Sequence, residues 1–390
     1  MTGDLDAALA AGPPLSGRER LGRLADLLER SGIDVDEIGR VDKIKVWQGF
    51  YKDADGEAHT VDMAGVVLSP SWAEGPEWPV VQPGPSVKMP PSKIKPVIVD
   101  GWQTAVIVPD IQAGYFRLAD GSLEATHDEG AIEIALAIIK QARPSLVVLV
   151  GDNADLPEFG KYRLSVAFQR TTQATIDRLT VLGAQLRAAA GPEARIVWLA
   201  GNHEERMPNY ILDNAVAAYG LKRGGTPDSW PVMSIPYLCR FDDHGIEYKP
   251  GYPAGSYWIN ERLRVIHGDK VASGGSTAHK YLATEKVSVI YGHIHRREWA
   301  ERTREDHDGP RTIMAASPGC LARVDGAVPS TKGGIDLDGR PIVRHEDWQQ
   351  GLAVVEFEPG DGRFVYEQIP IHDGHARWRG RTYVTGVDID

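Results

Sequence analysis

The sequence has only two cysteines and no long apolar run, and each scarcity excludes a class of protein. Cys239 and Cys320 cannot build a framework of disulfides, so we expect both to be reduced thiols. No stretch approaches the roughly eighteen consecutive apolar residues that a membrane-spanning helix needs. The start of the chain has neither the basic segment nor the apolar length typical of a secretory signal. We therefore expect a cytoplasmic protein with no membrane partner.

Positive charge is also scarce, because 43 basic residues face 54 acidic ones and leave a net charge of −11. Non-specific binding to duplex nucleic acid depends on a basic face, so this balance argues against it. It does not exclude an enzyme that acts on nucleic acid. A cluster of metal-binding carboxylates is itself negative, and bound divalent ions would offset several of those charges.

Composition divides the chain into five segments. We expect residues 1–14 to be a flexible tail and residues 15–68 a small α+β unit. That unit would hold a packing helix after the capping box at residues 16–19, with a helix-turn-helix as the alternative, and a hairpin around Asp55-Gly56. Eight of the 26 prolines fall in residues 69–100, which predicts an extended linker because proline blocks helices and central strands. Residues 101–375 would form the main domain and residues 376–390 a C-terminal extension.

Short apolar runs alternate with amphipathic stretches in the main domain, which is the pattern of a layered α/β fold. The predicted helices cover residues 129–142, 165–190 and 208–219, and a hairpin is expected over residues 351–371. The predicted strands are residues 105–108, 146–150, 195–199, 263–266, 287–291 and 312–316.

Five of these strands lead directly into side chains that can bind a metal ion. Ligands of open α/β sheets gather beyond the carboxyl ends of the strands, so we expect these side chains to meet. Each one alone would fit a turn, a cap or an ordinary histidine, but five in succession indicate a metal site. Glycines precede three of them and suit sharp turns. The residues are Asp110, Asp152, Asn202 with His203, His267, and His293 with His295.

The order of these residues resembles that of the calcineurin-like metallophosphoesterases. The matching motifs are Asp110-x-Gln112, Gly151-Asp152-x-x-Asp155, Gly201-Asn202-His203-Glu204, His267 and Gly292-His293-Ile294-His295. Over about residues 103–371, the resemblance implies a four-layer α/β/β/α sandwich with a two-metal site. It implies that Asp152 bridges both ions, that Asp110 and His295 bind the first, and that the second is bound by Asn202, His267 and His293. His203 would contact the phosphate or protonate the leaving group, oriented by Asp155, for which a helix N-cap is the alternative.

Gln112 departs from the family, which usually has histidine at this position. Its amide could be a weak metal ligand that favours a harder ion such as Mn or Mg. It could instead hold a bound water beside the ion, or leave the first site half-occupied. We favour the first two interpretations, because the third would leave Asp110, Asp152 and His295 without a purpose.

The resemblance predicts a metal-dependent phosphoester hydrolase that uses a metal-activated water and a histidine general acid. We expect two divalent ions, manganese first, with iron, zinc or magnesium as alternatives. The first expectation for the activity is a phosphodiesterase or nuclease acting on single-stranded nucleic acid or nucleotides. The alternatives are a phosphomonoesterase, including a protein phosphatase, and a metal-poor scaffold. A protein phosphatase is disfavoured because Leu156-Pro157, not Arg-Gly, follows Asp155.

Two further sets of residues are candidates for substrate contact. Aromatic residues between the third and fourth motifs could form a wall of the cleft and stack bases, or could simply pack. Four arginines could hold phosphate or a nucleic-acid backbone. The aromatics are Trp230, Tyr237, Tyr248, Tyr252, Tyr257 and Trp258, and the arginines are Arg163, Arg170, Arg296 and Arg297.

Overall fold

The computed structural model describes residues 38–70 and 101–386, except 162–164, 308, 327, 329–336, 338–345 and 361, together with positions 26, 29, 30 and 32. The chain divides into two compact units, Met1–Ser86 and Val87–Asp390. The expected tail, most of the first helix and nearly all of the linker lie outside the described residues. No helix in the described residues is long and apolar enough to cross a membrane.

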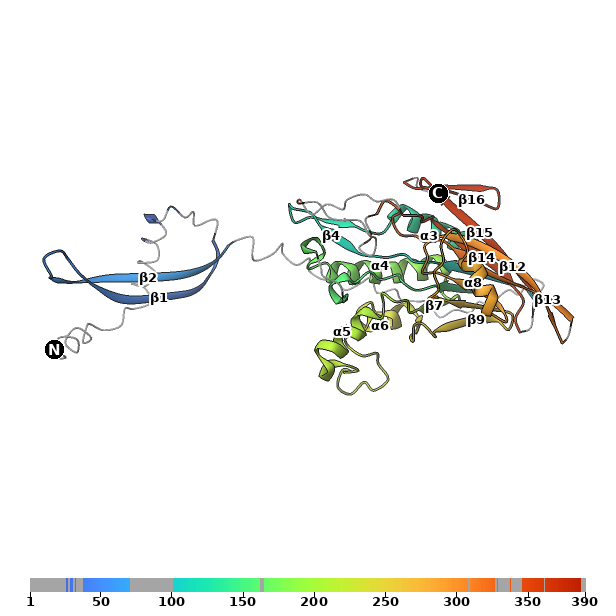
Figure 1. Cartoon of the computed structure of the whole chain (residues 1–390), viewed down its shortest axis with the longest axis horizontal. Helices are drawn as coiled ribbons and strands as arrows, with labels where there is room; N and C mark the ends of the chain where they lie inside the picture. The colour runs from blue at the N-terminus through green and yellow to red at the C-terminus, as the bar shows by residue number, and fades with distance from the viewer. Residues whose placement is uncertain are drawn as a thin grey trace. The chain divides into compact units, whose positions relative to one another are not determined.

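The described part of the first unit is an antiparallel hairpin of β1 (Ile38–Lys52) and β2 (Ala58–Pro70), shown in blue in Figure 1. The N–H of Gly56 donates to the carbonyl of Asp53 at 3.1 Å, which closes the turn. The Asp53 carboxylate accepts from the N–H groups of Asp55 and Glu57, both at 3.0 Å. The hairpin predicted around Asp55-Gly56 is therefore present, with strands over residues 38–52 and 58–70.

The second unit is built on two mixed sheets (Figure 1). The larger has the order β17-β16-β15-β14-β3-β6-β7-β8, and its strands β3, β6, β7 and β8 are parallel. The bounds are β3 (Gln103–Val108), β6 (Leu146–Leu149), β7 (Arg195–Leu199), β8 (Ile246–Lys249), β14 (Gly351–Phe357), β15 (Phe364–His372), β16 (His375–Trp378) and β17 (Arg381–Val384). β17 and most of β16 lie in the segment expected as a C-terminal extension, and both continue this sheet.

The smaller sheet has the order β12-β13-β11-β10-β9, and its strands β10, β11 and β13 are parallel. The bounds are β9 (Ser256–Asn260), β10 (Leu263–Ile266), β11 (Ser288–Tyr291), β12 (Arg297–Asp306) and β13 (Gly309–Pro318). A separate short pair, β4 (Tyr115–Arg117) with β5 (Leu123–Ala125), follows β3 in the chain.

Alternate side chains of each central strand enter different hydrophobic cores, and this alternation defines the layers. In β3, Val106 and Val108 pack with the helices α3 (Glu129–Ala142) and α4 (Thr172–Ala190). Ala105 and Ile107 pack in a second core between the two sheets. On the outer face of the smaller sheet, Tyr291 packs against α8 (Thr277–Thr284). The predicted α/β/β/α order of layers is therefore confirmed.

The six predicted strands are all present, because strands buried on both faces read as continuous apolar runs. The predicted helix over residues 129–142 also matches α3. The helix predicted over 165–190 begins only at Thr172, because the Glu158 carboxylate caps its start by accepting from the N–H groups of Thr171 and Thr172 at 3.0 and 2.9 Å. A short 3₁₀ turn, Val166–Phe168, takes the preceding residues.

The excursion between β7 and β8 is less regular than its sequence suggests. The helix predicted over residues 208–219 is divided into α5 (Arg206–Asn214) and a 3₁₀ turn, Val216–Ala218, because Ala215 leaves the helical conformation with a φ of −152°. Two single-turn helices follow, α6 (Ile235–Leu238) and α7 (Phe241–His244).

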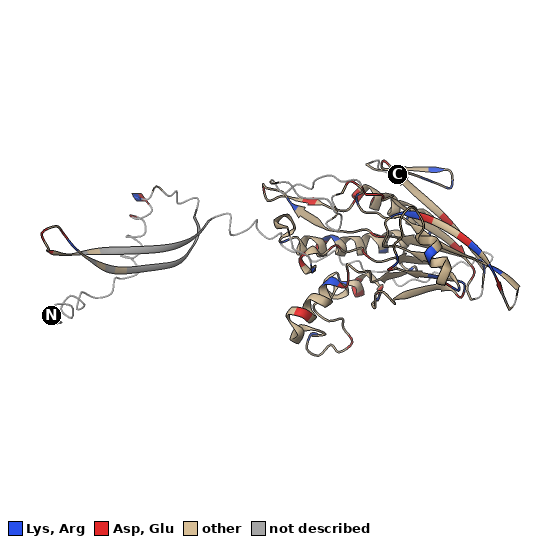
Figure 2. Ribbon diagram, viewed as in Figure 1, with Lys and Arg blue, Asp and Glu red and all other residues tan. Residues whose placement is uncertain are grey.

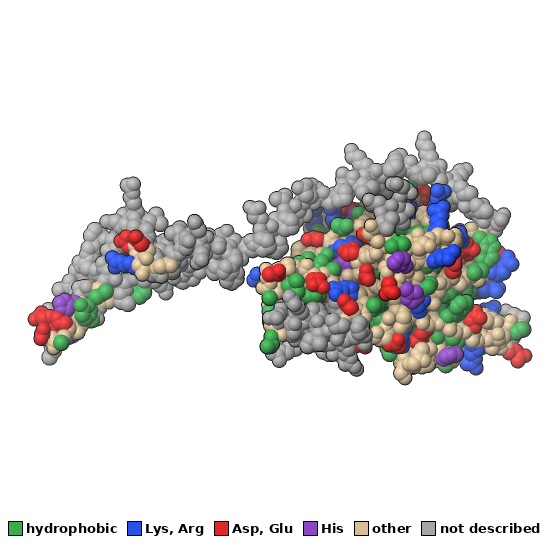
Figure 3. Space-filling view, turned by 90° about the horizontal axis from the view of Figure 1, so that it is seen from above, with side chains coloured by type: hydrophobic (Ala, Val, Ile, Leu, Met, Phe, Trp, Pro, Cys, Tyr) green, Lys and Arg blue, Asp and Glu red, His purple; other side chains and the backbone are tan. Residues whose placement is uncertain are grey.

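Charged side chains of both signs are interspersed over the second unit (Figure 2). The face seen in Figure 3 likewise mixes acidic, basic and histidine side chains, with no broad basic patch among those drawn in colour. This distribution agrees with the argument from net charge against a duplex-binding face.

Candidate metal centre

The predicted ligands come together because of the sheet topology. Asp110, Asp152 and Asn202 follow the parallel strands β3, β6 and β7 of the larger sheet, and His267 and His293 follow the parallel strands β10 and β11 of the smaller one. Carboxyl ends of parallel strands meet at one edge of a sheet, and here the edges of both packed sheets coincide. Backbone bonds join the loops, since the N–H of Gln112 donates to the carbonyl of Asp152 at 2.9 Å.

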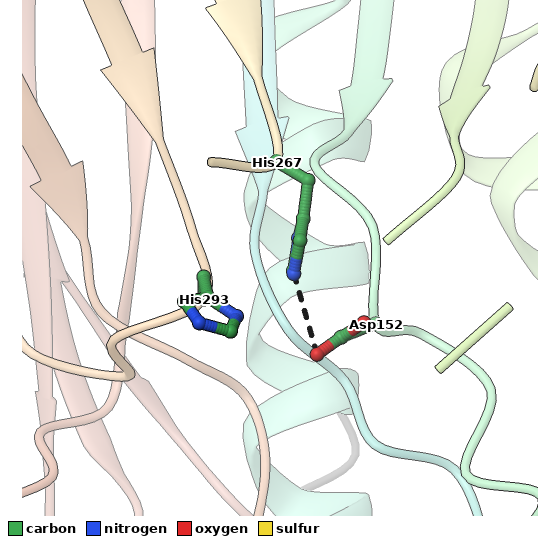
Figure 4. A group of neighbouring side chains, drawn as sticks. All are labelled: Asp152, His267 and His293. Carbon is green, nitrogen blue, oxygen red and sulfur yellow. Dashed lines mark ion pairs between the residues drawn. The ribbon is translucent and has the colours of Figure 1, made fainter. Parts of the chain in front are cut away.

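Two groups of potential ligands share Asp152. The first group is Asp110, Asp152 and His295, and the second is Asp152, His267 and His293. Within each group the candidate ligand atoms all lie within 4.8 Å of one another. Figure 4 shows the second group, with His267 directed at Asp152 from the end of its strand. A carboxylate common to both groups is suited to bridging two ions.

In the second group, His267 is oriented as a metal-binding histidine usually is. His267 Nε2 lies 3.3 Å from Asp152 Oδ2 and 3.1 Å from Asn202 Oδ1. The other ring nitrogen, Nδ1, lies 3.1 Å from the carbonyl oxygen of Val150, to which it donates. That bond leaves the Nε2 lone pair facing the site, which is the usual arrangement of a metal-binding histidine.

Two buried oxygen atoms at the first group have no hydrogen-bond partner. Asp110 Oδ1 lies 3.3 Å from His295 Nε2 and accepts from the N–H of His293 at 2.9 Å. Asp110 Oδ2 and Gln112 Oε1 are buried without a hydrogen-bond partner. Buried acceptors that lack donors are costly unless a cation satisfies them, so the donor set fits a divalent ion.

Gln112 lies inside this group. Its Nε2 is 3.3 Å from Asp152 Oδ2 and also 3.3 Å from His295 Nε2. A half-turn of the amide would exchange its nitrogen for its oxygen at the same position. The side chain therefore reaches the atoms of the first group directly.

Strained backbone is concentrated in the predicted ligands. Ten non-glycine residues in the described part of the chain have a positive φ, and five of them are predicted ligands. Such conformations persist only where the surrounding structure enforces them, and they cluster at functional sites. The five residues and their φ values are Asp110 (33°), Gln112 (52°), Asp152 (50°), His293 (70°) and His295 (55°).

Sharp turns were predicted at the three motif glycines, but only one of the three glycines makes such a turn. Gly151 has a φ of 106° and so does make a turn that favours glycine. Gly201 and Gly292 are not among the positive-φ glycines. A Cβ on Gly201 would collide with Oδ1 of Asp152, and one on Gly292 with Oδ2 of Asp110. These two glycines are needed because a ligand carboxylate lies against each of them.

Electrostatics within the site favour the metal-binding forms of Asp152 and His293, whereas the charge of Asp152 favours the protonated form of His267. Burial would raise the pKa of Asp152, but the neighbouring His203 and His267 outweigh it and hold the pKa well below the usual value. Burial lowers the pKa of His293, which favours the neutral ring that binds metals. Burial acts in the same direction on His267, but the charge of Asp152 dominates and raises its pKa to about 9.

His203 and Asp155 are brought together beside the ligand groups. His203 Nδ1 lies 3.2 Å from Asp155 Oδ1, and its Nε2 lies 3.7 Å from Asp152 Oδ2. Asp155 is completely buried and also contacts Nη1 of Arg206. Burial opposes ionisation of Asp155, but the Arg206 charge keeps its pKa below the usual value. Asp155 therefore lies beside Nδ1, while Nε2 lies toward Asp152.

Glu204 is a positioning residue to which the sequence analysis gave no role. Its buried carboxylate accepts from the N–H groups of Asp152 and Gly201 at 2.8 Å and of Asn153 at 2.9 Å. Burial, followed by the charge of Asp152, raises its pKa, while the N–H donors favour the ionised form. The carboxylate ties the loop after β6 to the loop after β7. The position of Glu204 directly after His203 in the motif was the sequence signal that could have indicated this role.

Two aromatic rings lie against histidines that are predicted ligands. The ring of Tyr252 is 5.5 Å from that of His267, and the ring of Trp348 is 4.0 Å from that of His295, between centroids. Tyr252 was among the predicted aromatics, whereas no sequence pattern indicated Trp348. Four of the other predicted aromatics pack elsewhere: Trp230 with Tyr248, Tyr257 with Arg195, and Trp258 with Arg264.

Two of the arginines proposed from sequence, Arg296 and Arg297, contact other groups of the protein. Arg296 binds the Glu298 carboxylate at 3.2 Å and the carbonyl of Ala272 at 2.7 Å. Arg297 reaches His372 at 3.4 Å. Arg163 lies outside the described residues. The arginine beside the catalytic candidates is instead Arg206, which the sequence analysis did not single out.

A four-layer α/β/β/α sandwich with two Asp/His groups sharing one aspartate defines the class of metal-dependent phosphoesterases. Residues 105–297 match the family model for calcineurin-like phosphoesterases, so this part of the chain is a domain of that family. No curated protein matches the chain. The family establishes metal-dependent phosphoester hydrolysis as the general chemistry of the domain.

Proposed function

We propose that the protein is a phosphodiesterase or nuclease that acts on nucleotides or single-stranded nucleic acid. The observation that carries the proposal is the sharing of Asp152 between two ligand groups, with His203 beside it. The residues proposed to hold two divalent ions, manganese first, are Asp110, Gln112, Asp152, Asn202, His267, His293 and His295.

When bound, the two ions supply charge neutralisation of the phosphoryl group and activation of a water molecule. The protein's own contribution is to fix its oxygen and nitrogen donors at the ends of buried strands, so that they need not reorganise during reaction. Asp152 contributes to both groups, and Glu204 fixes its backbone through the 2.8 Å bond to the N–H of Asp152.

His203 is proposed as the general acid for the leaving group. Its Nε2 faces the ligand groups, and Asp155 lies 3.2 Å from Nδ1 on the opposite side of the ring. A carboxylate at that distance favours a proton on Nδ1 and stabilises the ring when it is charged. The charged ring carries its second proton on Nε2, from which it is donated to the leaving oxygen in the transition state.

The aromatic rings at the two groups support a nucleotide substrate. Tyr252 lies beside His267 and Trp348 beside His295, so a flat ring accompanies each ligand group. Bases stack on aromatic side chains with little regard to sequence, and each such contact contributes about 1–3 kcal/mol. The net charge of −11 and the mixed charges on the face seen in Figure 3 favour single strands or nucleotides over long duplexes.

The test is hydrolysis of chromogenic substrates by manganese-loaded protein, comparing bis-p-nitrophenyl phosphate with p-nitrophenyl phosphate. We expect the diester to be the better substrate, and a single-stranded oligonucleotide to be cut faster than a duplex. A preference for the monoester would instead identify a phosphomonoesterase. No hydrolysis with any divalent ion, and no metal by elemental analysis, would identify a scaffold.

The variant His203→Ala tests the assigned acid. We expect turnover to fall about a hundred- to ten-thousand-fold, because proton transfer to the leaving group is lost. Metal content, measured by elemental analysis, should stay at the wild-type level because His203 is not a proposed ligand. Loss of metal in parallel with activity would make His203 a ligand and contradict the assignment.

A further inference from the structure

Arg206 has contacts that the proposed metal chemistry does not use. It is the first residue of α5 and lies three positions after His203, so the two side chains project from neighbouring points of one turn. Nη1 contacts Asp155 Oδ1, and Nη2 lies 2.7 Å from His203 Nε2. One arginine thus touches both members of the proposed acid pair.

The two ends of this guanidinium have unequal partners. Nη1 meets the carboxylate of Asp155, which is completely buried and needs a compensating charge. Among the contacts of the described residues, Nη2 meets only a ring nitrogen of His203 and no carboxylate. A hydrogen bond from guanidinium to a phosphoryl oxygen is roughly twice as strong as a bond between neutral groups. Nη1 is therefore anchored, whereas Nη2 has a better partner available in an anionic substrate.

The position of Nη2 fits such a substrate. It lies beside His203 Nε2, the atom proposed to meet the leaving oxygen, and this atom is 3.7 Å from the shared Asp152. The Arg206 side chain is 20% exposed, while Asp155 beneath it is not exposed at all, so a ligand can reach the guanidinium but not its anchor. The planar fork can keep one bond while the other changes partner.

We propose that Arg206 binds the phosphoryl group of the substrate, with Nη2 donating to a non-bridging oxygen while Nη1 stays on Asp155. This inference rests on the proposed function and adds a substrate-binding residue to it. The substrate displaces Nη2 from His203 Nε2, so that nitrogen no longer contacts the guanidinium. A phosphoryl oxygen is thereby held by a protein cation in addition to the metal ions.

The second arginine–carboxylate–histidine set of the domain provides a matched control. Arg178 Nη2 binds the Glu129 carboxylate at 2.6 Å, and the same carboxylate binds His127 Nε2 at 2.8 Å. This set joins α3 to α4 and includes none of the predicted ligands. Arg178→Ala therefore removes an equivalent ion pair without altering the proposed site.

The experiment measures binding of inorganic phosphate to manganese-loaded protein by calorimetry, together with KM and kcat for the diester. For Arg206→Ala we expect the dissociation constant for phosphate and the KM each to rise at least about tenfold, equivalent to about 1.4 kcal/mol. Arg206→Lys should recover part of the affinity, since it keeps the charge without the fork. Metal content should match the wild type, and Arg178→Ala should bind phosphate normally.

Unchanged phosphate affinity in Arg206→Ala, with a lower kcat, would overturn the inference and leave Arg206 as a positioning residue for His203. If the alanine variant does not fold, Arg206→Lys and Arg206→Gln give the same comparison. Failure of the proposed function would look different, because the wild type itself would then prefer the monoester or hydrolyse no phosphoester at all. Phosphate binding that depends on Arg206 in such an inactive protein would still support the binding role.

Discussion

Gln112 is the residue at which this site differs most from the pattern it resembles. Its amide lies 3.3 Å from atoms of both Asp152 and His295, inside the first ligand group. A neutral amide oxygen is a weaker donor than imidazole for zinc, and it suits harder ions such as manganese or magnesium. The identity of this one side chain therefore bears on which ion the first group selects.

We predict that Gln112→His makes the first group prefer zinc, because an imidazole nitrogen replaces the amide. The measurement is metal content after dialysis against equal concentrations of manganese and zinc. Gln112→Leu is the control, since it fills similar space without a donor and should lose affinity for both ions. If both variants keep the wild-type stoichiometry and selectivity, Gln112 does not contact the ion.

Most of the proposed ligands could be identified from the sequence because they follow recognisable apolar strands. Asp110 and His293 are examples, since the run before each of them is buried on both faces. Arg206 and Trp348 could not be predicted in this way. They reach the site from an irregular excursion and from a loop, so their positions depend on tertiary packing that leaves no periodic pattern in sequence.

At the scale of elements, a charged contact at the start of α3 joins α3 to α4 in addition to their shared hydrophobic core. Glu129 binds Arg178 of α4 and the buried His127. Partial burial would raise the pKa of Glu129, but His127 and Arg178 outweigh it and lower the pKa to about 2. A carboxyl whose pKa is lowered by folding stabilises the protein above its ordinary pKa, and that stabilisation is lost as pH falls.

We predict that Glu129→Gln lowers stability near neutral pH and that the difference from wild type shrinks between about pH 4.5 and pH 2. The effect should be below about 1 kcal/mol, because Glu129 is half-exposed and solvent screens the pair. Urea unfolding across this pH range is the measurement. Glu133→Gln, an exposed change on the same helix, is the control. A difference that stays constant with pH would show that the charge of Glu129 is unimportant.

Some helices and strands were placed accurately from the sequence and others were not, for physical reasons. Buried strands and α3 carry strong patterns, and their predicted positions agree with the structure. The start of α4 could not be placed, because the Glu158 carboxylate that caps it lies fourteen residues before Thr172. Capping by a residue outside the local sequence gives no signature at the helix end.

At the scale of the whole molecule, the proposed chemistry belongs to one unit. Every hydrophobic core formed by the described residues, and every predicted ligand, lies between residues 105 and 383. A segment that has its own cores and its own site can fold and function as a domain.

We predict that a chain of residues 101–390 keeps the metal content and the diesterase activity of the full protein, within about a factor of two. Thermal unfolding, elemental analysis and the chromogenic assay would be compared with the full-length protein under the same conditions. Loss of metal or of cooperative unfolding in the shorter chain would show that residues 1–100 complete the domain.

The positive-φ ligands have a consequence for how the domain can change over time. Each such residue opposes folding by about 1–3 kcal/mol relative to a conformation that suits it, although aspartate tolerates it best. Exchanging Gln112 or His295 for glycine would relieve that strain and abolish the ligand together. Selection for a more stable fold and selection for a working site therefore act in opposite directions at the same positions. A descendant released from its catalytic role would be expected to lose these side chains first.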